Sequence, residues 1–196
     1  MEIIIHRVNK IKELKLLPSE MGCEIDIRTN GSEIILNHDP FQNGEKLSDY
    51  LDEYNKRGTL VLNIKETGIE DVVLKEVRRR EIKSYFLLDV EFPYLFKATE
   101  NGERNIAVRF SEKEPINNLN LFMNKLDWVW IDTITKLPVN KQNVDKINKL
   151  KSCLVCPSRW GKYENIPLIK TKINDLGLNL KSVITSINQV SKWSKI

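Results

Sequence analysis

Apolar and β-branched residues recur along the chain in short runs, separated by polar or helix-like segments. Eight of these runs have the length and composition of β-strands. They span residues 2–6, 23–28, 59–65, 84–91, 105–111, 127–132, 152–158 and 182–187. A ninth extended piece at 33–38 follows the second run after the turn sequence TNGS, which predicts a hairpin.

Most gaps between these runs can hold a helix. The clearest is 44–58, which places four apolar residues on one face and ends at a glycine. Similar patterns occupy 69–82, 139–151 and 166–179, whereas 92–105 is less clearly helical. Eight strands that alternate with crossovers predict an α/β protein, a compact (β/α)8 TIM barrel. We expect a single domain over residues 1–196, because no linker or repeat interrupts the pattern.

Composition narrows the function classes. The net charge of +4 is too weak to indicate nucleic-acid binding, but it is compatible with an anionic ligand such as phosphate. No apolar run approaches the ~18 residues that span a bilayer, and no signal peptide is visible, so we expect a cytoplasmic protein without a transmembrane segment. Three cysteines give no disulfide framework, and Cys153 and Cys156 are interpreted as thiols in a buried strand. The oligomeric state stays open.

Polar residues at the ends of barrel strands are candidates for an active site, because that face carries the chemistry in this fold. Glu24 and Asp26 are two apart in the second run, so they share one face of the strand. Two neighbouring carboxylates repel each other unless a proton or a cation lies between them. Mg²⁺ or Ca²⁺ suits such oxygen ligands, and we predict a divalent metal here.

The next two runs repeat this spacing. Asn63 and Lys65 flank an isoleucine, so the amide oxygen of Asn63 could serve the metal and the Lys65 ammonium a phosphate. Asp89 and Glu91 are again two apart and are predicted to contact the substrate.

Both histidines of the chain lie at strand ends. His6 and Arg7 end the first run, and His38 ends the extended piece at 33–38. Each residue alone has an ordinary structural explanation, such as a turn or a solvent-facing pair, but their coincidence on the first two strands indicates a site. Two imidazoles can act as acid and base in phosphoryl transfer, with cations stabilising the phosphate charge.

Later strand ends offer residues for a substrate pocket. Arg109 lies at the end of the fifth strand, Trp130 and Asp132 lie at the end of the sixth, and Arg159 follows the seventh. An arginine beside a tryptophan can bind a phosphate and a sugar or glycerol face, although core packing also explains each tryptophan.

Three short motifs in the first third of the chain resemble those of glycerophosphodiester phosphodiesterases, within the wider group of barrel phosphodiesterases. The sequences IIIHR, GCEIDIR and LNHDP match the family's His-Arg, Glu-x-Asp and His-Asp motifs, all within residues 2–65. The resemblance implies that His6 and His38 form the acid/base pair and that Glu24 and Asp26 bind the metal. It also implies that Arg7 and Lys65 contact the phosphate.

The chain departs from this family pattern at several positions. Asn63 replaces the third acidic metal ligand, which should lower metal affinity, and Val8 stands where the family prefers glycine. Ser186 stands where the family usually has an acid. The small insertion domain that normally follows His-Asp is absent, because residues 40–51 run straight into the next predicted helix.

Three functions remain open from the sequence. The first is a metal-dependent phosphodiesterase that hydrolyses a small glycerophosphodiester-like or sugar-phosphate substrate by His/His catalysis. The second is a binding or regulatory module on the same barrel that has lost efficient turnover, as the Asn63 replacement suggests. A more remote alternative is an aldolase-like barrel in which Lys65 forms a Schiff base.

Overall fold

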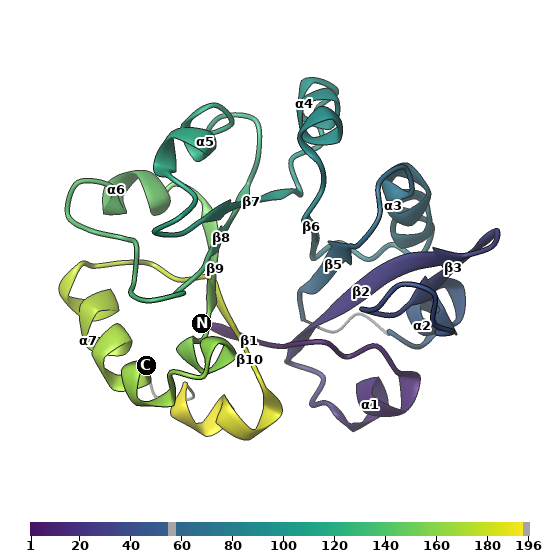
Figure 1. The fold of residues 1–196 in the computed structure, drawn as a ribbon, viewed down its shortest axis with the longest axis horizontal. Helices are drawn as coiled ribbons and strands as arrows, with labels where there is room; N and C mark the ends of the chain where they lie inside the picture. The colour runs from purple at the N-terminus through teal and green to yellow at the C-terminus, as the bar shows by residue number, and fades with distance from the viewer. Residues whose placement is uncertain (55–57, 194–196) are drawn as a thin grey trace. The chain divides into compact units, whose positions relative to one another are not determined.

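The computed structural model describes residues 1–54 and 58–193 (Figure 1). The chain divides into two compact units, one made of Met1–Ile3 with Lys97–Ile196 and the other of Ile4–Phe96. The division falls inside strand β1 (Glu2–Ile5) and helix α4 (Phe92–Glu100), so both elements contribute to both units.

The unit Ile4–Phe96 is built on a parallel sheet. Its central strand is β2 (Gly22–Asn30), which pairs in parallel with the end of β1 and with β5 (Leu60–Ile64), and β5 pairs in parallel with β6 (Tyr85–Leu88). The far half of β2 turns back into the antiparallel strand β3 (Glu33–Leu36), and β4 (Glu45–Lys46) extends this hairpin. The predicted hairpin at the TNGS turn is therefore confirmed.

The other unit carries four parallel strands in the order β10-β9-β8-β7. They are β7 (Ala107–Phe110), β8 (Trp128–Ile131), β9 (Lys151–Val155) and β10 (Ser182–Thr185). The start of β1 joins this sheet where the Glu2 amide donates to the Lys181 carbonyl at 2.9 Å. All eight predicted strands and the ninth extended piece are thus confirmed, with ends that differ by a few residues.

Helices fill most of the connections. In chain order the helices are α1 (Ile11–Leu16), α2 (Leu47–Glu53), α3 (Glu70–Arg79), α4, α5 (Ile116–Asn120), α6 (Val144–Ile147) and α7 (Ile166–Asp175), with 3₁₀ turns η1 (Pro157–Trp160), η2 (Tyr163–Asn165) and η3 (Ile187–Lys192).

Several predicted helices are shorter in the structure. The predicted helix at 44–58 begins with β4, leaves only Leu47–Glu53 helical, and includes residues 55–57, which lie outside the described part. The pattern at 139–151 yields the single turn of α6, because Asn140 and Asn143 bond to each other's backbone at its start instead of extending the helix. Conversely, the weak pattern at 92–105 does form α4.

The strands are buried on both faces, as parallel strands covered by helices usually are. Every residue of β5, β6 and β8 is buried, and so are the first six residues of β2. Helix α3 shows how the covering layer forms: Val73, Leu74 and Val77 are buried on one face. Its acidic first turn and basic last turn also complement the helix dipole. A charged side chain inside such a sheet therefore needs a neighbouring group that compensates its charge.

Candidate functional site

The two carboxylates of β2 lie in the middle of the parallel sheet of the unit Ile4–Phe96. Glu24 is 2 % exposed and Asp26 is 1 % exposed, while Ile25 and Ile27 fill the opposite face of the strand. Asp26 stands in register with Asn63 of β5, so the predicted shared face extends across both strands. Burial of two like charges requires compensating groups, and the surrounding residues supply them.

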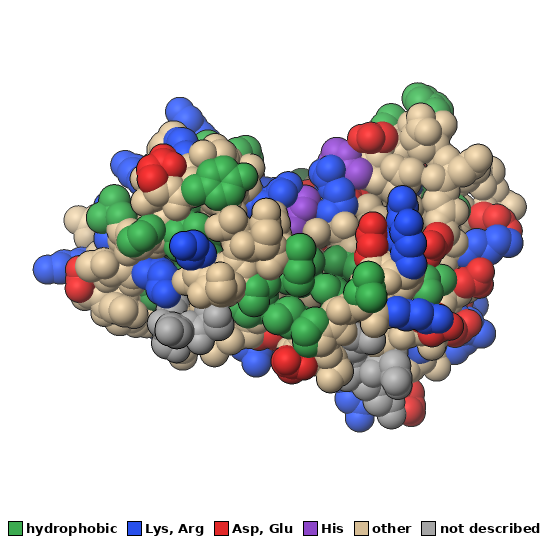
Figure 2. Space-filling model, turned by 90° about the horizontal axis from the view of Figure 1, so that it is seen from below, with side chains coloured by type: hydrophobic (Ala, Val, Ile, Leu, Met, Phe, Trp, Pro, Cys, Tyr) green, Lys and Arg blue, Asp and Glu red, His purple; other side chains and the backbone are tan. Residues whose placement is uncertain are grey.

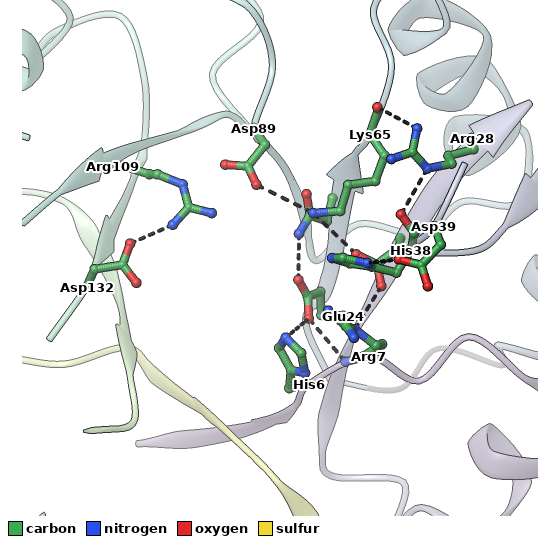
Figure 3. Close-up of polar contacts among 12 residues, drawn as sticks. His6, Arg7, Glu24, Arg28, His38, Asp39, Lys65, Asp89, Arg109 and Asp132 are labelled. Carbon is green, nitrogen blue, oxygen red and sulfur yellow. Dashed lines mark hydrogen bonds and ion pairs between the residues drawn. The ribbon is translucent and has the colours of Figure 1, made fainter. Parts of the chain in front are cut away.

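Glu24 is held by three neighbours. Its Oε1 accepts a hydrogen bond from Asn63 Nδ2 at 2.7 Å, and its Oε2 accepts the Arg7 amide at 3.1 Å and lies 3.3 Å from His6 Nε2 (Figure 3). Burial raises the pKa of the Glu24 carboxyl, and the negative charge of Asp26 raises it further. The Asn63 hydrogen bond, the Lys65 charge and the Arg7 amide lower this pKa without cancelling the rise.

Asp26 is surrounded by cations and one amide. Asn9 forms a two-point contact: its Oδ1 accepts the Asp26 amide at 2.8 Å and its Nδ2 donates to Asp26 Oδ2 at 2.9 Å. Arg7 Nε lies 3.5 Å from the same oxygen, and Lys65 Nζ lies 3.4 Å from Asp26 Oδ1. Lys65 also lies 3.7 Å from Asp89 Oδ2, so its ammonium is placed between two carboxylates (Figure 3).

Two residues of this cluster adopt a left-handed backbone that L side chains rarely adopt. The φ of Arg7 is 56° and that of Asp89 is 60°. Such a conformation costs about 1–3 kcal/mol per residue and persists where the surrounding structure enforces it. At Arg7 it lets the amide reach the Glu24 carboxylate while the next amide, that of Val8, donates to the Glu24 carbonyl at 2.8 Å. The strain is therefore coupled to the placement of the buried acid.

His38 lies beyond the end of β3 and is oriented by two contacts. Its Nδ1 is 2.7 Å from Asp39 Oδ1, and this hydrogen bond lowers the pKa of the Asp39 carboxyl. Arg28 Nε donates to the His38 carbonyl at 3.0 Å, and Arg28 Nη1 donates to the Lys65 carbonyl at 3.0 Å. One guanidinium thus joins the histidine loop to the end of β5. The His38 side chain is 40 % exposed, and Figure 2 shows histidine at the surface with basic side chains beside it.

The remaining predicted residues fall into separate places. Arg109 Nη1 contacts Asp132 Oδ2 at 2.6 Å, and its guanidinium lies 5.6 Å from the centroid of the buried Trp130 ring, all within the unit that contains Lys97–Ile196 (Figure 3). Arg159 is exposed in η1. The Glu91 side chain is exposed, and no contact joins it to the Glu24–Asp26 cluster within the described residues.

Sequence reasoning did not select three residues that hold this site together: Asn9, Arg28 and Asp39. A signal for Arg28 was present, because Glu24, Asp26 and Arg28 follow one another at a spacing of two on a single face of β2. Asp39 belonged to a quoted motif but was given no role. Nothing local marks Asn9, since its two bonds are made to a residue seventeen positions away.

Divalent cations such as Mg²⁺ and Ca²⁺ are bound by oxygen atoms, and the cluster contains carboxylate and amide oxygens. Asn63 Oδ1 is buried and has no hydrogen-bond partner, and it belongs to a residue that contacts Glu24 and stands in register with Asp26. A buried acceptor without a donor is a costly arrangement that a cation would relieve. Within residues 1–54 and 58–193, no group of three or more His, Cys, Asp or Glu side chains is arranged to hold a metal. The unpartnered Asn63 oxygen beside the two carboxylates is the feature of this cluster that a hard cation would satisfy.

The three cysteines are buried free thiols, as predicted for Cys153 and Cys156. In the described part of the chain, none of the helices has the length and apolar character needed to cross a bilayer.

Parallel strands that alternate with helices define a TIM-barrel fold. Two solved structures from Agrobacterium tumefaciens strain C58 share it. One is assigned as a glycerophosphoryl diester phosphodiesterase, with a TM-score of 0.62 and 11 % identity over 94 % of this chain and 93 % of that one. The other is a glycerophosphodiester phosphodiesterase, with a TM-score of 0.63 and 10 % identity over 94 % and 96 %.

These likenesses confirm the predicted barrel, and at such low identity they concern the fold alone. No family model and no curated protein matches the sequence.

Proposed function

We propose that the protein is a metal-assisted phosphodiesterase that hydrolyses a small phosphodiester. One observation carries the proposal: Arg7 and Lys65, two phosphate-binding cations, both contact the buried Asp26 beside Glu24 and His6. The Arg28 guanidinium donates hydrogen bonds to the backbone carbonyls of His38 and Lys65. Acid, base and cations in one cluster are the components that phosphoryl transfer requires.

Arg7 and Lys65 would bind the phosphate. Asp26 holds the Arg7 and Lys65 side chains at 3.5 and 3.4 Å, so both cations are positioned before the substrate arrives. The guanidinium offers a planar pair of donors and the ammonium a compact charge, which together suit a tetrahedral anion. Asp89, Glu91, Arg109, Trp130, Asp132 and Arg159 remain predicted substrate contacts.

His38 and His6 would transfer the protons. Asp39 holds His38 through Nδ1, which fixes the ring, so His38 is suited to take a proton from the attacking group at Nε2. His6 would return a proton to the leaving oxygen, with Glu24 orienting its ring.

Glu24, Asp26 and Asn63 would hold the divalent cation, Mg²⁺ or Ca²⁺. When bound, the cation would stabilise negative charge on the phosphate. Free thiols at all three cysteines support a reducing, cytoplasmic setting.

The test is hydrolysis of bis(p-nitrophenyl) phosphate by the full chain, first in EDTA and then with Mg²⁺, Ca²⁺ or Mn²⁺. We expect metal-restored activity that falls by about 10²–10⁴-fold in His6→Ala and in His38→Ala, the usual contribution of acid–base catalysis. Asp39→Asn should reduce kcat less, because His38 remains. Full activity in the His6→Ala, His38→Ala double variant would sink the proposal.

A second candidate is a phosphate-binding module with little turnover. It is favoured by Asn63, whose amide donates to the Glu24 oxygen that would otherwise face a metal. Tight binding of metal and of a phosphodiester, without hydrolysis under any metal, would select this candidate over the enzyme.

A further inference from the structure

A cavity of about 400 Å³ lies at the amino-terminal ends of β1, β10 and β9, three neighbouring strands, within the unit that contains Lys97–Ile196. Its volume falls in the range of about 300–1,000 Å³ that small-molecule sites occupy. Barrel enzymes carry their chemistry at the opposite, carboxyl-terminal ends of the strands, where Arg109 and Asp132 lie in this unit. The cavity shares no residue with the proposed phosphodiesterase site.

Lysine side chains dominate the charge of this cavity. The charged side chains in its lining are Lys149, Lys151, Lys181 and Glu2, three positive charges against one negative charge. The Lys149 and Lys181 side chains are exposed, and neither has a hydrogen bond or ion pair with the residues that the structure describes, 1–54 and 58–193. Like charges gathered around a hollow raise its positive potential and attract anions.

Lys151 begins β9, and two contacts position its side chain. The Lys151 Nζ lies 3.3 Å from Asp127 Oδ2 and 5.6 Å from the centroid of the Trp128 ring. Asp127 also accepts a hydrogen bond from Arg104 Nε at 2.8 Å, so one carboxylate serves two cations. The positive charge at the cavity is therefore only partly compensated by these acids of the protein.

The backbone that carries these lysines is held in place by hydrogen bonds. Asn148 Oδ1 accepts the Asn179 amide at 2.8 Å, and the buried Ser152 Oγ donates to the Asn179 carbonyl at 3.3 Å. The Glu2 amide donates to the Lys181 carbonyl at 2.9 Å. The walls of the cavity are thus shaped before any ligand enters, which lowers the entropic cost of binding.

The composition of the lining indicates which anion fits. The lining contains no arginine, so it cannot make the planar, bidentate contacts that guanidinium groups make with carboxylates. Lysine ammonium groups act instead as compact point charges, which favour the anion with the most charge in the smallest space. The lining also contains no aromatic ring on which a nucleobase could stack. These properties favour a small polyphosphate without a base.

We propose that this cavity is a second anion site, which binds a small polyphosphate of the pyrophosphate class through Lys149, Lys151 and Lys181. Three ammonium groups around one hollow match an anion whose charge is spread over two linked phosphate groups. The site goes beyond the proposed phosphodiesterase function and does not rest on it, because none of its residues belongs to the Glu24–Asp26 cluster.

The experiment is an NMR titration of the isotope-labelled full chain with inorganic pyrophosphate, in buffer freed of metal ions because metals would bind the pyrophosphate. The indole N–H signal of Trp128 is the local reporter, since the Lys151 ammonium lies over this ring, and Trp128→Phe assigns the signal. We expect the signal to shift saturably. The Kd should be about tenfold or more higher in the Lys149→Gln, Lys181→Gln double variant, because each lost ammonium removes a charge-assisted hydrogen bond.

The matched control is the Lys141→Gln, Lys172→Gln double variant, which changes the net charge equally at exposed residues outside the cavity and should retain the wild-type Kd. Equal weakening in both double variants, or a Trp128 signal that does not respond to pyrophosphate, would overturn the inference. Citrate, an anion of similar charge, should bind more weakly, and equal binding of citrate would overturn the assignment to phosphate.

The binding measurement also separates this site from the proposed active site. Pyrophosphate bound only at Arg7 and Lys65 would leave the Kd unchanged in the Lys149→Gln, Lys181→Gln double variant, and that result would overturn the inference. Hydrolysis of bis(p-nitrophenyl) phosphate should be equal in this double variant and the wild type. If no phosphodiester is hydrolysed at all, only the enzyme proposal fails, because the Trp128 signal still reports binding at the cavity.

Discussion

Replacement of Arg28 by methionine removes a side chain that joins the His38 loop to the end of β5. Arg28 donates to the His38 carbonyl and to the Lys65 carbonyl, each at 3.0 Å, and methionine keeps its apolar stem without the donors. A hydrogen bond from a charged group contributes about 1.5–3 kcal/mol when its partner is left unpaired. Because Arg28 is only half-buried, water can replace part of the lost hydrogen bonding. We therefore expect the free energy of unfolding to fall by about 2–3 kcal/mol in total.

The effect on catalysis should exceed the effect on stability. Loss of the Arg28 bonds frees both the His38 loop and the end of β5, and a misplacement of ~1 Å in a catalytic group can reduce the rate by about 100-fold. The loss should appear in kcat more than in KM, since Arg7, the proposed phosphate ligand, is unchanged. Arg28→Lys retains the charge but carries its donors on a single nitrogen, so it cannot reproduce the two-nitrogen geometry of the guanidinium and should recover kcat only in part.

Urea unfolding and steady-state hydrolysis of bis(p-nitrophenyl) phosphate measure the two effects separately. Arg104→Met is the matched control, because Arg104 also joins a side chain, that of Asp127, to a backbone carbonyl, that of Asn124. It should lose stability while retaining kcat. If Arg28→Met retains kcat despite its loss of stability, or loses no more activity than Arg104→Met, Arg28 does not position the site.

Three further changes probe the same unit. Asn63→Asp places a carboxylate against Glu24, so thermal unfolding in EDTA should show a lower Tm than that of the wild type. The added carboxylate should also raise the affinity for Mg²⁺ or Ca²⁺ by about tenfold or more. An unchanged affinity would contradict the proposed ligand set. Glu24 has a raised pKa, so its contribution to stability is full below its ordinary pKa of 4.5 and is lost as the pH rises through the folded value. In EDTA, the unfolding free energy of Glu24→Gln should therefore increase relative to that of the wild type as the pH rises above 4.5. A difference in unfolding free energy that does not depend on pH would refute this. Gly44→Ala should lower the free energy of unfolding by about 1–3 kcal/mol, because a Cβ there would lie 2.3 Å from the Leu36 carbonyl oxygen. An unaltered midpoint of urea unfolding would show that the backbone shifts to accommodate the methyl group.

The strands could be predicted because burial on both faces leaves a strong signal in the sequence. β5 and β6 are entirely buried apolar runs apart from Asn63, and such runs bounded by polar segments are hard to mistake. The same logic located Glu24 and Asp26, since charged residues inside a buried strand are rare and need partners. The helices were less predictable, because α6 is limited by local asparagine bonds that compete with helix extension.

Partners of the site residues were beyond the sequence for a different reason. Asn9 contacts Asp26 only because β1 and β2 are parallel neighbours, and no local pattern encodes that pairing. The left-handed backbone of Arg7 was equally hidden, since neither arginine nor the valine that follows it favours positive φ. The residues proposed to bind ligands follow strand periodicity, whereas the residues that orient them depend on which strands are neighbours.

Besides its proposed effect on metal affinity, Asn63 affects the charge balance of the cluster. Glu24, Asp26 and Asp89 face Arg7 and Lys65, so the chain's own cations already compensate most of the negative charge. A further acid at 63 would leave Glu24 with a like charge at about 2.7 Å, whereas the Asn63 amide donates a hydrogen bond to it. We infer that Asn63 lets the site form with its carboxylates buried before any metal binds, at the expense of metal affinity. The Tm of Asn63→Asp in EDTA measures the loss of stability without metal, and the recovery of Tm when metal is added measures the gain in metal affinity.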